Sequence, residues 1–216
     1  MSKSPKTYSI GEEIANSITH GAGILLGIAG LAVLTAFASV YGNVRHIVGV
    51  SVFGAAMIVM YTASTLYHSI THPRAKQILR IFDHAAIFVL IAGTYTPFTL
   101  VTLKGPLGWV LFGVVWGLAA LGIVMQIVSL ERLSFLSLFL YLGMGWAVIF
   151  AIKPLLATLP AGGLTLLVLG GLAYTAGVLF YVWRKPYFHA IWHGFVLAGT
   201  TFHFFAILLY VIPVLR

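Results

Sequence analysis

Five residues able to do metal or acid–base chemistry stand at the edges of long apolar segments: Ser64, His68, Asp83, His189 and His193. An aspartate at the centre of a membrane helix costs about 2.5–3.5 kcal/mol, so such side chains need polar partners or an ion. Neutral imidazoles and a carboxylate are common ligands of a shared metal. The sequence therefore predicts a metal site at one face of a membrane.

The spacing of the histidines supports a common site. His189 and His193 are four residues apart, which places them about 40° apart on one helix face. With His68 they would supply three nitrogens to a zinc ion and leave its fourth tetrahedral position open, as in catalytic zinc sites. We predict these three histidines as ligands, with Asp83 orienting or deprotonating the water at the open position.

Further polar residues line the same region of the predicted helices. Ser64 lies one turn before the second-span histidine, and Tyr61 three residues before Ser64 on the same stripe. Glu13, Asn16 and His20 form another stripe near the start of the first span. We expect these last three to support the metal ligands, cap the helix or gate a substrate.

Other interpretations of the polar residues stay open at this point. The histidines and Asp83 would also fit a hydrogen-bonded network that holds helices together without a metal. His203 falls near the face of His189 and His193, about 15 Å deeper at 1.5 Å per residue; it either packs as a satisfied histidine or lines an interior cavity. The chain has no cysteine, so thiolate sites and disulfides are excluded.

The composition assigns the chain to a membrane. Of its 216 residues 61% are hydrophobic and only 7% charged, whereas soluble domains average about 25% charged residues. The twelve Lys and Arg residues are scattered through short loops. That pattern is typical of orientation signals and lipid-headgroup contacts, so no nucleic-acid partner is expected.

Seven apolar segments are long enough to cross a bilayer as helices, which need about 20 residues each. The segments are 18–41, 46–67, 81–103, 107–129, 135–152, 164–183 and 190–212. We predict an all-α membrane protein, a single seven-helix domain over residues 1–216 with a short cytoplasmic segment 1–14. Pro97 should kink the third helix.

The positive-inside rule orients the bundle. Eight basic residues fall on the amino-terminal side: Lys3, Lys6, Arg74, Lys76, Arg80, Arg132, Arg184 and Lys185. Four fall on the other side: Arg45, Lys104, Lys153 and Arg216. The amino terminus should therefore be cytoplasmic and the carboxyl terminus outside, with the histidines near the cytoplasmic leaflet.

Four motifs carry a family resemblance: Glu13 with Asn16-Ser17-x-Thr19-His20-Gly21, Ser64-x-x-x-His68, Asp83-x-x-x-Ile87 and His189-x-x-x-His193. Together they resemble the hemolysin III family, the bacterial branch of the progestin and adipoQ receptor (PAQR) proteins, which are related to alkaline ceramidases in the CREST superfamily. The resemblance implies a seven-helix fold and a cytoplasmic-side zinc on His68, His189 and His193. It also places Asp83 and Ser64 around the metal-bound water.

The resemblance further implies hydrolysis of lipid amides such as ceramides, or a part in membrane-lipid or membrane-energetic homeostasis, beside an older label of haemolysin. Membrane lipids are the expected partners, and the plasma membrane (the bacterial inner membrane) is the expected location. Three alternatives stand beside a zinc hydrolase: a non-enzymatic sensor with structural zinc, a pore-forming haemolysin, and a bis-histidine haem carrier.

Overall fold

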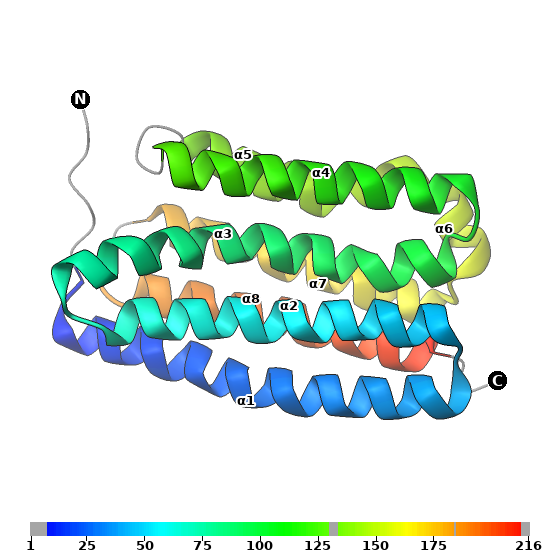
Figure 1. The fold of residues 1–216 in the computed structure, drawn as a ribbon, viewed down its shortest axis with the longest axis horizontal. Coiled ribbons are helices and arrows are strands. Elements are labelled where there is room, and N and C mark those ends of the chain that lie inside the picture. Colours follow the sequence, from blue (N-terminus) through cyan, green and yellow to red (C-terminus); the bar gives the residue numbers. More distant parts are fainter. Residues whose placement is uncertain (1–7, 130–133, 184, 213–216) are drawn as a thin grey trace.

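The protein is a bundle of long, roughly aligned helices (Figure 1). A computed structural model describes residues 8–129, 134–183 and 185–212, and within these ranges every regular element is helical. Seven helices are long and apolar enough to cross a membrane, which confirms the predicted seven-helix membrane protein. The start of the first helix and the end of the last lie at opposite ends of the bundle.

The helical elements in chain order are α1 (Ile10–Tyr41), α2 (Val44–Ser69), α3 (Pro73–Pro97), η1 (Phe98–Thr102), α4 (Pro106–Ser129), α5 (Ser134–Trp146), η2 (Ala147–Ala151), α6 (Ile152–Thr158), α7 (Ala161–Val182), α8 (Phe188–Ala206) and η3 (Ile207–Val211). Short η elements continue three of the spans. Thus α3 with η1 forms the third span, α5 to α6 the fifth, and α8 with η3 the seventh.

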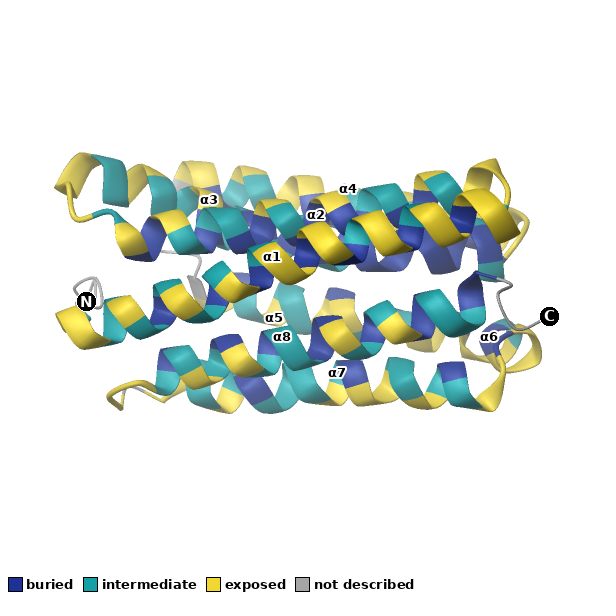
Figure 2. Cartoon of the chain, turned by 90° about the horizontal axis from the view of Figure 1, so that it is seen from below, coloured by how far each residue is buried: buried dark blue, intermediate teal, exposed yellow. Residues whose placement is uncertain are grey.

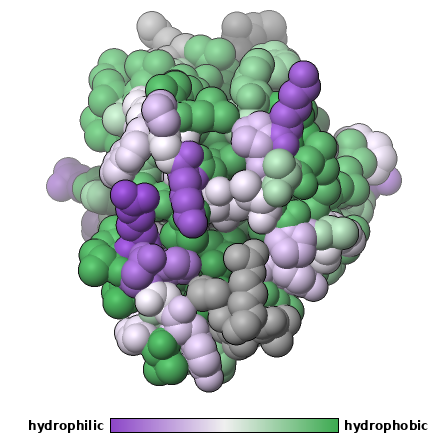
Figure 3. Space-filling model, turned by 90° about the vertical axis from the view of Figure 1, so that its right-hand side faces the viewer, coloured by the Kyte–Doolittle hydropathy of each residue, from purple (hydrophilic) through white to green (hydrophobic). Residues whose placement is uncertain are grey.

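Packing relates helices that are distant in sequence. Helix α1 packs against both α2 and α8, while α2 packs on α3 and α7 on α8. Buried positions follow one face of each helix and exposed positions the other (Figure 2). The exposed face is apolar, with Phe150 87% and Val128 76% exposed, so it requires a hydrocarbon solvent. At the end of the bundle opposite the start of α1, hydrophilic residues stand among the apolar ones (Figure 3).

Two helices begin eight residues earlier than the hydropathy pattern predicts. Helix α1 begins at Ile10 because Ser9 and Glu12 form a capping box, in which Ser9 Oγ accepts from the Glu12 amide at 3.3 Å and the Glu12 carboxylate accepts from the Ser9 amide at 3.0 Å. Helix α3 begins at Pro73, a residue that favours the first helical turn. Glu13 and Asp83 therefore stand inside helices, where their side chains have fixed directions.

Other boundaries also differ from expectation. The α-helical part of the third span ends at Pro97, and the chain continues through the π-helical turn η1. The disruption expected at this proline is therefore a change from α-helix to π-helix. The fifth span extends to Thr158 rather than residue 152. The orientation prediction rests partly on Lys3, Lys6, Arg132, Arg184 and Arg216, which lie outside the described residues.

A glycine contact tests the α2–α3 interface. A Cβ on Gly93 would lie 2.5 Å from the Cβ of Ala56, whereas a Cβ on the exposed Gly113 would meet nothing within 4 Å. We expect Gly93→Ala to lower the free energy of unfolding by about 1–3 kcal/mol through overpacking. Gly113→Ala makes the same chemical change and should not lower it. Thermal unfolding in detergent measures both variants, and equal melting temperatures would contradict the close packing described.

Candidate metal centre

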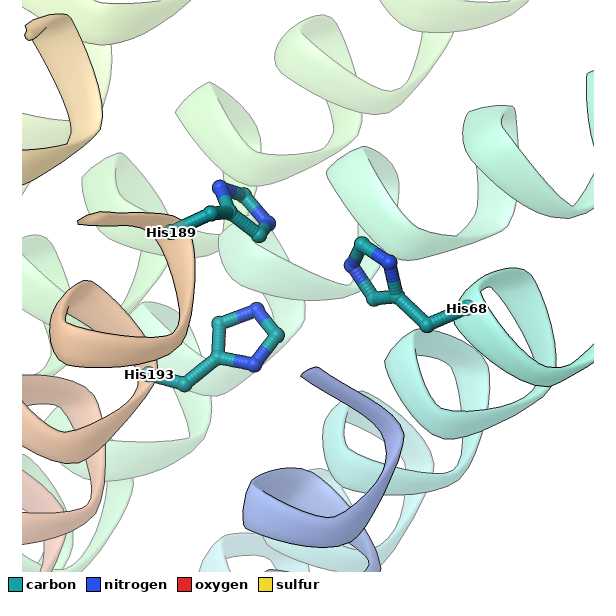
Figure 4. Close-up of side chains that lie close together, drawn as sticks. All are labelled: His68, His189 and His193. Carbon is teal, nitrogen blue, oxygen red and sulfur yellow. The ribbon is translucent and has the colours of Figure 1, made fainter. Parts of the chain in front are cut away.

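Three histidines converge at the end of the bundle where α1 begins. His68 lies in the last turn of α2, and His189 and His193 lie in the first two turns of α8. Each offers one ring nitrogen, and these nitrogens all lie within 4.8 Å of one another. All three side chains are buried, and their rings face a common space (Figure 4). The three residues predicted as ligands are thus brought together in a group that could hold a metal ion.

The carboxylate of Glu13 orients the His68 ring. Glu13 Oε2 lies 2.6 Å from His68 Nδ1, and a carboxylate only accepts, so Nδ1 carries the hydrogen and donates it. The Nε2 lone pair then faces the cluster. Such a carboxylate–histidine pair fixes the tautomer and raises the basicity of metal ligands in many proteins.

The backbone of α1 orients His193 in the same way. His193 Nδ1 lies 3.3 Å from the Asn16 carbonyl oxygen and 3.1 Å from Thr19 Oγ1. The Thr19 hydroxyl gives its own hydrogen to the α1 backbone, so its oxygen accepts from the imidazole. Among the described residues, the buried Nε2 atoms of His68 and His193 have no hydrogen-bond partner. Two oriented, unshared lone pairs in a buried space fit a metal ion well.

Lys76 completes the support of His68. Its Nζ lies 2.8 Å from Glu13 Oε1 and donates to the backbone oxygen of Tyr67 at 2.9 Å. The lysine thereby neutralises the carboxylate that holds the imidazole and ties the start of α3 to the end of α2. Sequence reasoning counted Lys76 only as an orientation signal. Its position in the first turn after Pro73 becomes informative only once α3 is known to begin there.

The predicted supporting residues divide into two groups. Glu13 and Asn16 act on the ligand histidines directly, since the Glu13 carboxylate accepts from His68 Nδ1 and the Asn16 carbonyl oxygen accepts from His193 Nδ1. His20 instead stacks on His193, with ring centroids 3.5 Å apart and an interplanar angle of 11°. Tyr61 packs edge-on against His20 at 5.2 Å. His20 therefore shapes the wall of the site and lies outside the converging group.

The two residues predicted as catalytic, around the metal-bound water, lie near the cluster but outside it. Ser64 is buried one turn before His68, and its Oγ has no hydrogen-bond partner among the described residues. Asp83 is 7% exposed, and a carboxylate oxygen lies 3.4 Å from His84 Nδ1. The Asp83 carboxylate does not belong to the group of atoms within 4.8 Å of one another. Their catalytic roles stay predictions.

A segment before α1 covers the cluster. The Tyr8 ring lies 5.6 Å from the ring of His68 and 5.0 Å from that of His189. Burial raises the pKa of the Tyr8 hydroxyl, which therefore stays protonated. Glu12 Oε1 accepts from the Tyr187 amide at 3.1 Å, and this bond fastens the start of α1 to the loop before α8. Sequence reasoning missed Tyr8, which no spacing pattern marks.

An apolar cavity of about 200 Å³ lies inside the bundle, and His20, which stacks on His193, joins its wall to the histidine cluster. His20 and Asp83 line it near the cluster, and side chains of α2 to α8 line the rest, including His203. An apolar cavity inside the bundle can bind a hydrocarbon chain and keep it away from water. The cavity thus brings an apolar binding space next to the candidate metal ligands.

Comparisons with known proteins agree with the motifs. Residues 8–204 match the sequence family described as "Haemolysin-III related". The chain is 53% identical over 208 residues to "Hemolysin-3 homolog" of Bacillus subtilis (strain 168), covering 96% of this chain and 98% of that protein. It is 48% identical to "Hemolysin-3" of Bacillus cereus, covering 96% and 95%. "Monocyte to macrophage differentiation factor" of Homo sapiens is 28% identical over 203 residues, covering 91% and 83%.

The contact between Glu13 and His68 predicts a measurable effect on metal affinity. Replacing the carboxylate by the isosteric amide (Glu13→Gln) removes the charge that stabilises the metal-binding tautomer. We expect metal affinity to fall about 10–100-fold, the usual effect of losing such a partner. Competition with a chromogenic chelator measures the change. Glu131→Gln removes the same kind of charge elsewhere in the chain, so it is the matched control and should bind like the wild type; equal loss in both variants would contradict the specific role of Glu13.

Proposed function

This chain belongs to the haemolysin-III-related family, and from that premise we propose that it is a membrane zinc protein that hydrolyses lipid amides of the ceramide type. Its role would lie in membrane-lipid or membrane-energetic homeostasis. The observation that supports the proposal most is the convergence of three buried histidines beside an apolar cavity. A metal centre and a space for a hydrocarbon chain are the two parts that such an enzyme needs.

Zinc suits the donor set. His68, His189 and His193 supply three nitrogens, the chain has no thiolate, and zinc sites with three protein nitrogens keep a position for water or substrate. When bound, the ion supplies a Lewis acid for a carbonyl oxygen and lowers the pKa of water to about 7. Glu13 and the α1 backbone hold two of the ligands in the required orientation.

The remaining residues would bind and protonate the substrate. The cavity would hold the acyl chain and exclude water, while the amide lies beside the histidines. Hydrolysis adds the elements of water across the C–N bond, so one proton must leave the water and one must reach the nitrogen. A carboxylate oxygen of Asp83, which lines the cavity, would take the first proton and return it to the leaving amine. Ser64 Oγ, buried and unpartnered among the described residues, would hydrogen-bond the substrate.

The basic residues support a location for the site. Lys and Arg are more frequent in the loops on the side of the bundle where α1 begins, and short cytoplasmic loops carry that excess. The histidines would then face the cytoplasmic leaflet of the plasma membrane (the bacterial inner membrane). A lipid could reach them laterally from that leaflet.

One observation favours a second candidate, a sensor with structural zinc. Helix α1 packs against both α2 and α8, and the histidines come from these two helices. An ion shared by them would cross-link the bundle across α1. In that case zinc would stabilise the fold, and no lipid would be turned over.

A lytic pore has less support, although the two Bacillus relatives carry the name hemolysin. A conducting path needs polar side chains along several helices. Between α4 and α7 the described buried polar side chains are Gln126 and Ser137, and they hydrogen-bond each other at 2.7 Å. Such an isolated pair does not form a continuous polar path.

Metal content tests the premise of both zinc proposals. Purified wild-type protein should contain close to one zinc per chain by elemental analysis, since one cluster of three ligands is available. The triple variant His68→Ala, His189→Ala, His193→Ala should contain none, because no ligand remains.

A second triple variant serves as the control. His46, His72 and His84 lie outside the cluster, and their replacement by alanine removes the same number of imidazoles. This protein should keep its zinc. Loss of zinc in both triple variants, or its absence from the wild type, would contradict the assignment.

Turnover separates the enzyme from the sensor. Wild-type protein incubated with ceramide-type amides should release fatty acid, and Asp83→Asn should slow this about 10²–10⁴-fold, the usual contribution of a general acid–base. Asp83→Asn should keep its zinc, since Asp83 lies outside the converging group. If the wild type releases no fatty acid while His193→Ala lowers its melting temperature, zinc is structural. Unchanged turnover in Asp83→Asn would refute the role of this carboxylate.

A further inference from the structure

His203 is a buried polar residue that the metal centre does not use. It lies on α8, is 7% exposed and lines the cavity. Ten residues separate it from His193, which places it about 15 Å farther along the helix axis. It therefore stands deep in the part of the cavity where a hydrocarbon chain would lie.

The tautomer of His203 follows from its backbone contact. Its Nε2 lies 3.2 Å from the carbonyl oxygen of Leu167 on α7. A carbonyl oxygen only accepts hydrogen bonds, so Nε2 carries the ring hydrogen. In a neutral imidazole the other nitrogen is then an acceptor, and a charged ring without a carboxylate would be costly in this apolar surrounding. Nδ1 therefore carries no hydrogen and has an unshared lone pair.

This lone pair has no partner in the protein. Among the described residues, the buried His203 Nδ1 makes no hydrogen bond. Leaving a buried acceptor unsatisfied costs free energy, so such groups usually have a partner in the functional state.

Neighbouring polar side chains have already used their hydrogens. The Thr200 hydroxyl donates to the Val196 carbonyl at 2.9 Å, so the Tyr174 hydroxyl must donate to Thr200 at 2.7 Å. On the other wall, the Trp146 indole donates to Thr175, whose hydroxyl donates to the backbone. These bonds satisfy each donor within the protein. No hydrogen from these side chains is left for His203 Nδ1.

The backbone of α7 holds the His203 ring in place. A Cβ on Gly170 would lie 2.3 Å from His203 Nε2 and 2.4 Å from Cδ2, so only glycine permits this contact. The Nε2–Cδ2 edge therefore packs on α7, and Nδ1 belongs to the opposite edge of the ring. A ring that is fixed in orientation, with one acceptor unused, has the properties of a ligand-binding group.

We infer that His203 Nδ1 accepts a hydrogen bond from a hydroxyl on the chain of the bound lipid. The cavity would select lipids that carry this hydroxyl about 15 Å from the end at the histidine cluster, in the distal half of an octadecanoyl chain. The inference rests on the proposed function for placing the lipid head at the cluster. It adds a specificity-determining residue and narrows the substrate class to lipids with a hydroxylated chain.

A trapped water is the alternative partner for this nitrogen. A buried water usually makes two to four hydrogen bonds to polar groups. The hydrogens of Tyr174, Thr200, Trp146 and Thr175 are already donated within the protein, so these four side chains would give such a water no hydrogen bond. A water would also satisfy the nitrogen equally in the presence of any lipid, which an experiment can distinguish.

Binding of matched fatty acids tests the inference. Native mass spectrometry of the full-length wild-type protein would compare octadecanoic acid with hydroxyoctadecanoic acids that carry the hydroxyl at successive carbons. We expect one group of isomers in the distal half to bind about fivefold more tightly than the plain acid, the effect of one net hydrogen bond. A flat profile across the isomers would overturn the inference, and this result needs no variant.

Two variants assign the preference to His203. His203→Phe keeps a ring of similar size without the acceptor and should bind all isomers like the plain acid. Tyr174→Phe removes a neighbouring hydroxyl whose hydrogen is already used, and it should keep the preference. Persistence of the preference in His203→Phe, as expected if only a water occupies the nitrogen, would overturn the inference.

The binding assay is independent of catalysis. Isomer-selective binding without amide hydrolysis would refute the proposed enzyme and leave the hydroxyl site intact. Hydrolysis without isomer preference would refute the hydroxyl site and leave the enzyme intact.

Discussion

The structure depends on one constraint: the buried imidazoles of His68 and His193 each need a use for both of their nitrogens. Helix α1 meets half of that need, since Glu13 and the Asn16 carbonyl take the Nδ1 hydrogens of His68 and His193. The other nitrogens of these two rings are left pointing into a shared buried space. The early start of α1 is required for this arrangement, because without the capping box at Ser9 the residue Glu13 would not be held on a helix.

The polar side chains at the histidine end of the bundle are held by ion pairs and hydrogen bonds to neighbouring groups. Lys76 lies between the Glu13 carboxylate and backbone oxygens at the end of α2, so its charge is matched at the membrane boundary. Beyond this layer the cavity wall is largely apolar, and the hydroxyls of Tyr95, Tyr174 and Thr175 are bonded to the backbone or to another side chain. The polarity of the site thus changes abruptly from a polar layer to an apolar space. A lipid has the same order of polarity, with a polar head followed by a hydrocarbon chain.

Much of this arrangement could be predicted from the sequence. Hydropathy gave the seven spans, and the four-residue spacing of His189 and His193 on one helix face gave their convergence. The starts of α1 and α3 could not be found in this way, because capping and a first-turn proline extend a helix beyond its apolar part. The stacking of His20 on His193 was also beyond reach, since it depends on how α1 leans against α8. The contact of Lys76 with Glu13 joins two helices and leaves no periodic signal.

The bond between Glu12 and the Tyr187 amide has a kinetic consequence. Together with Tyr8, it closes the histidine cluster on the side where α1 begins. If the cluster holds an ion, opening of this segment would speed its exchange with solution, so the rate of exchange would depend on the local unfolding of the first turn of α1 as well as on the strength of the nitrogen ligands. Uptake of the ion would then be fastest during folding, before the segment has docked.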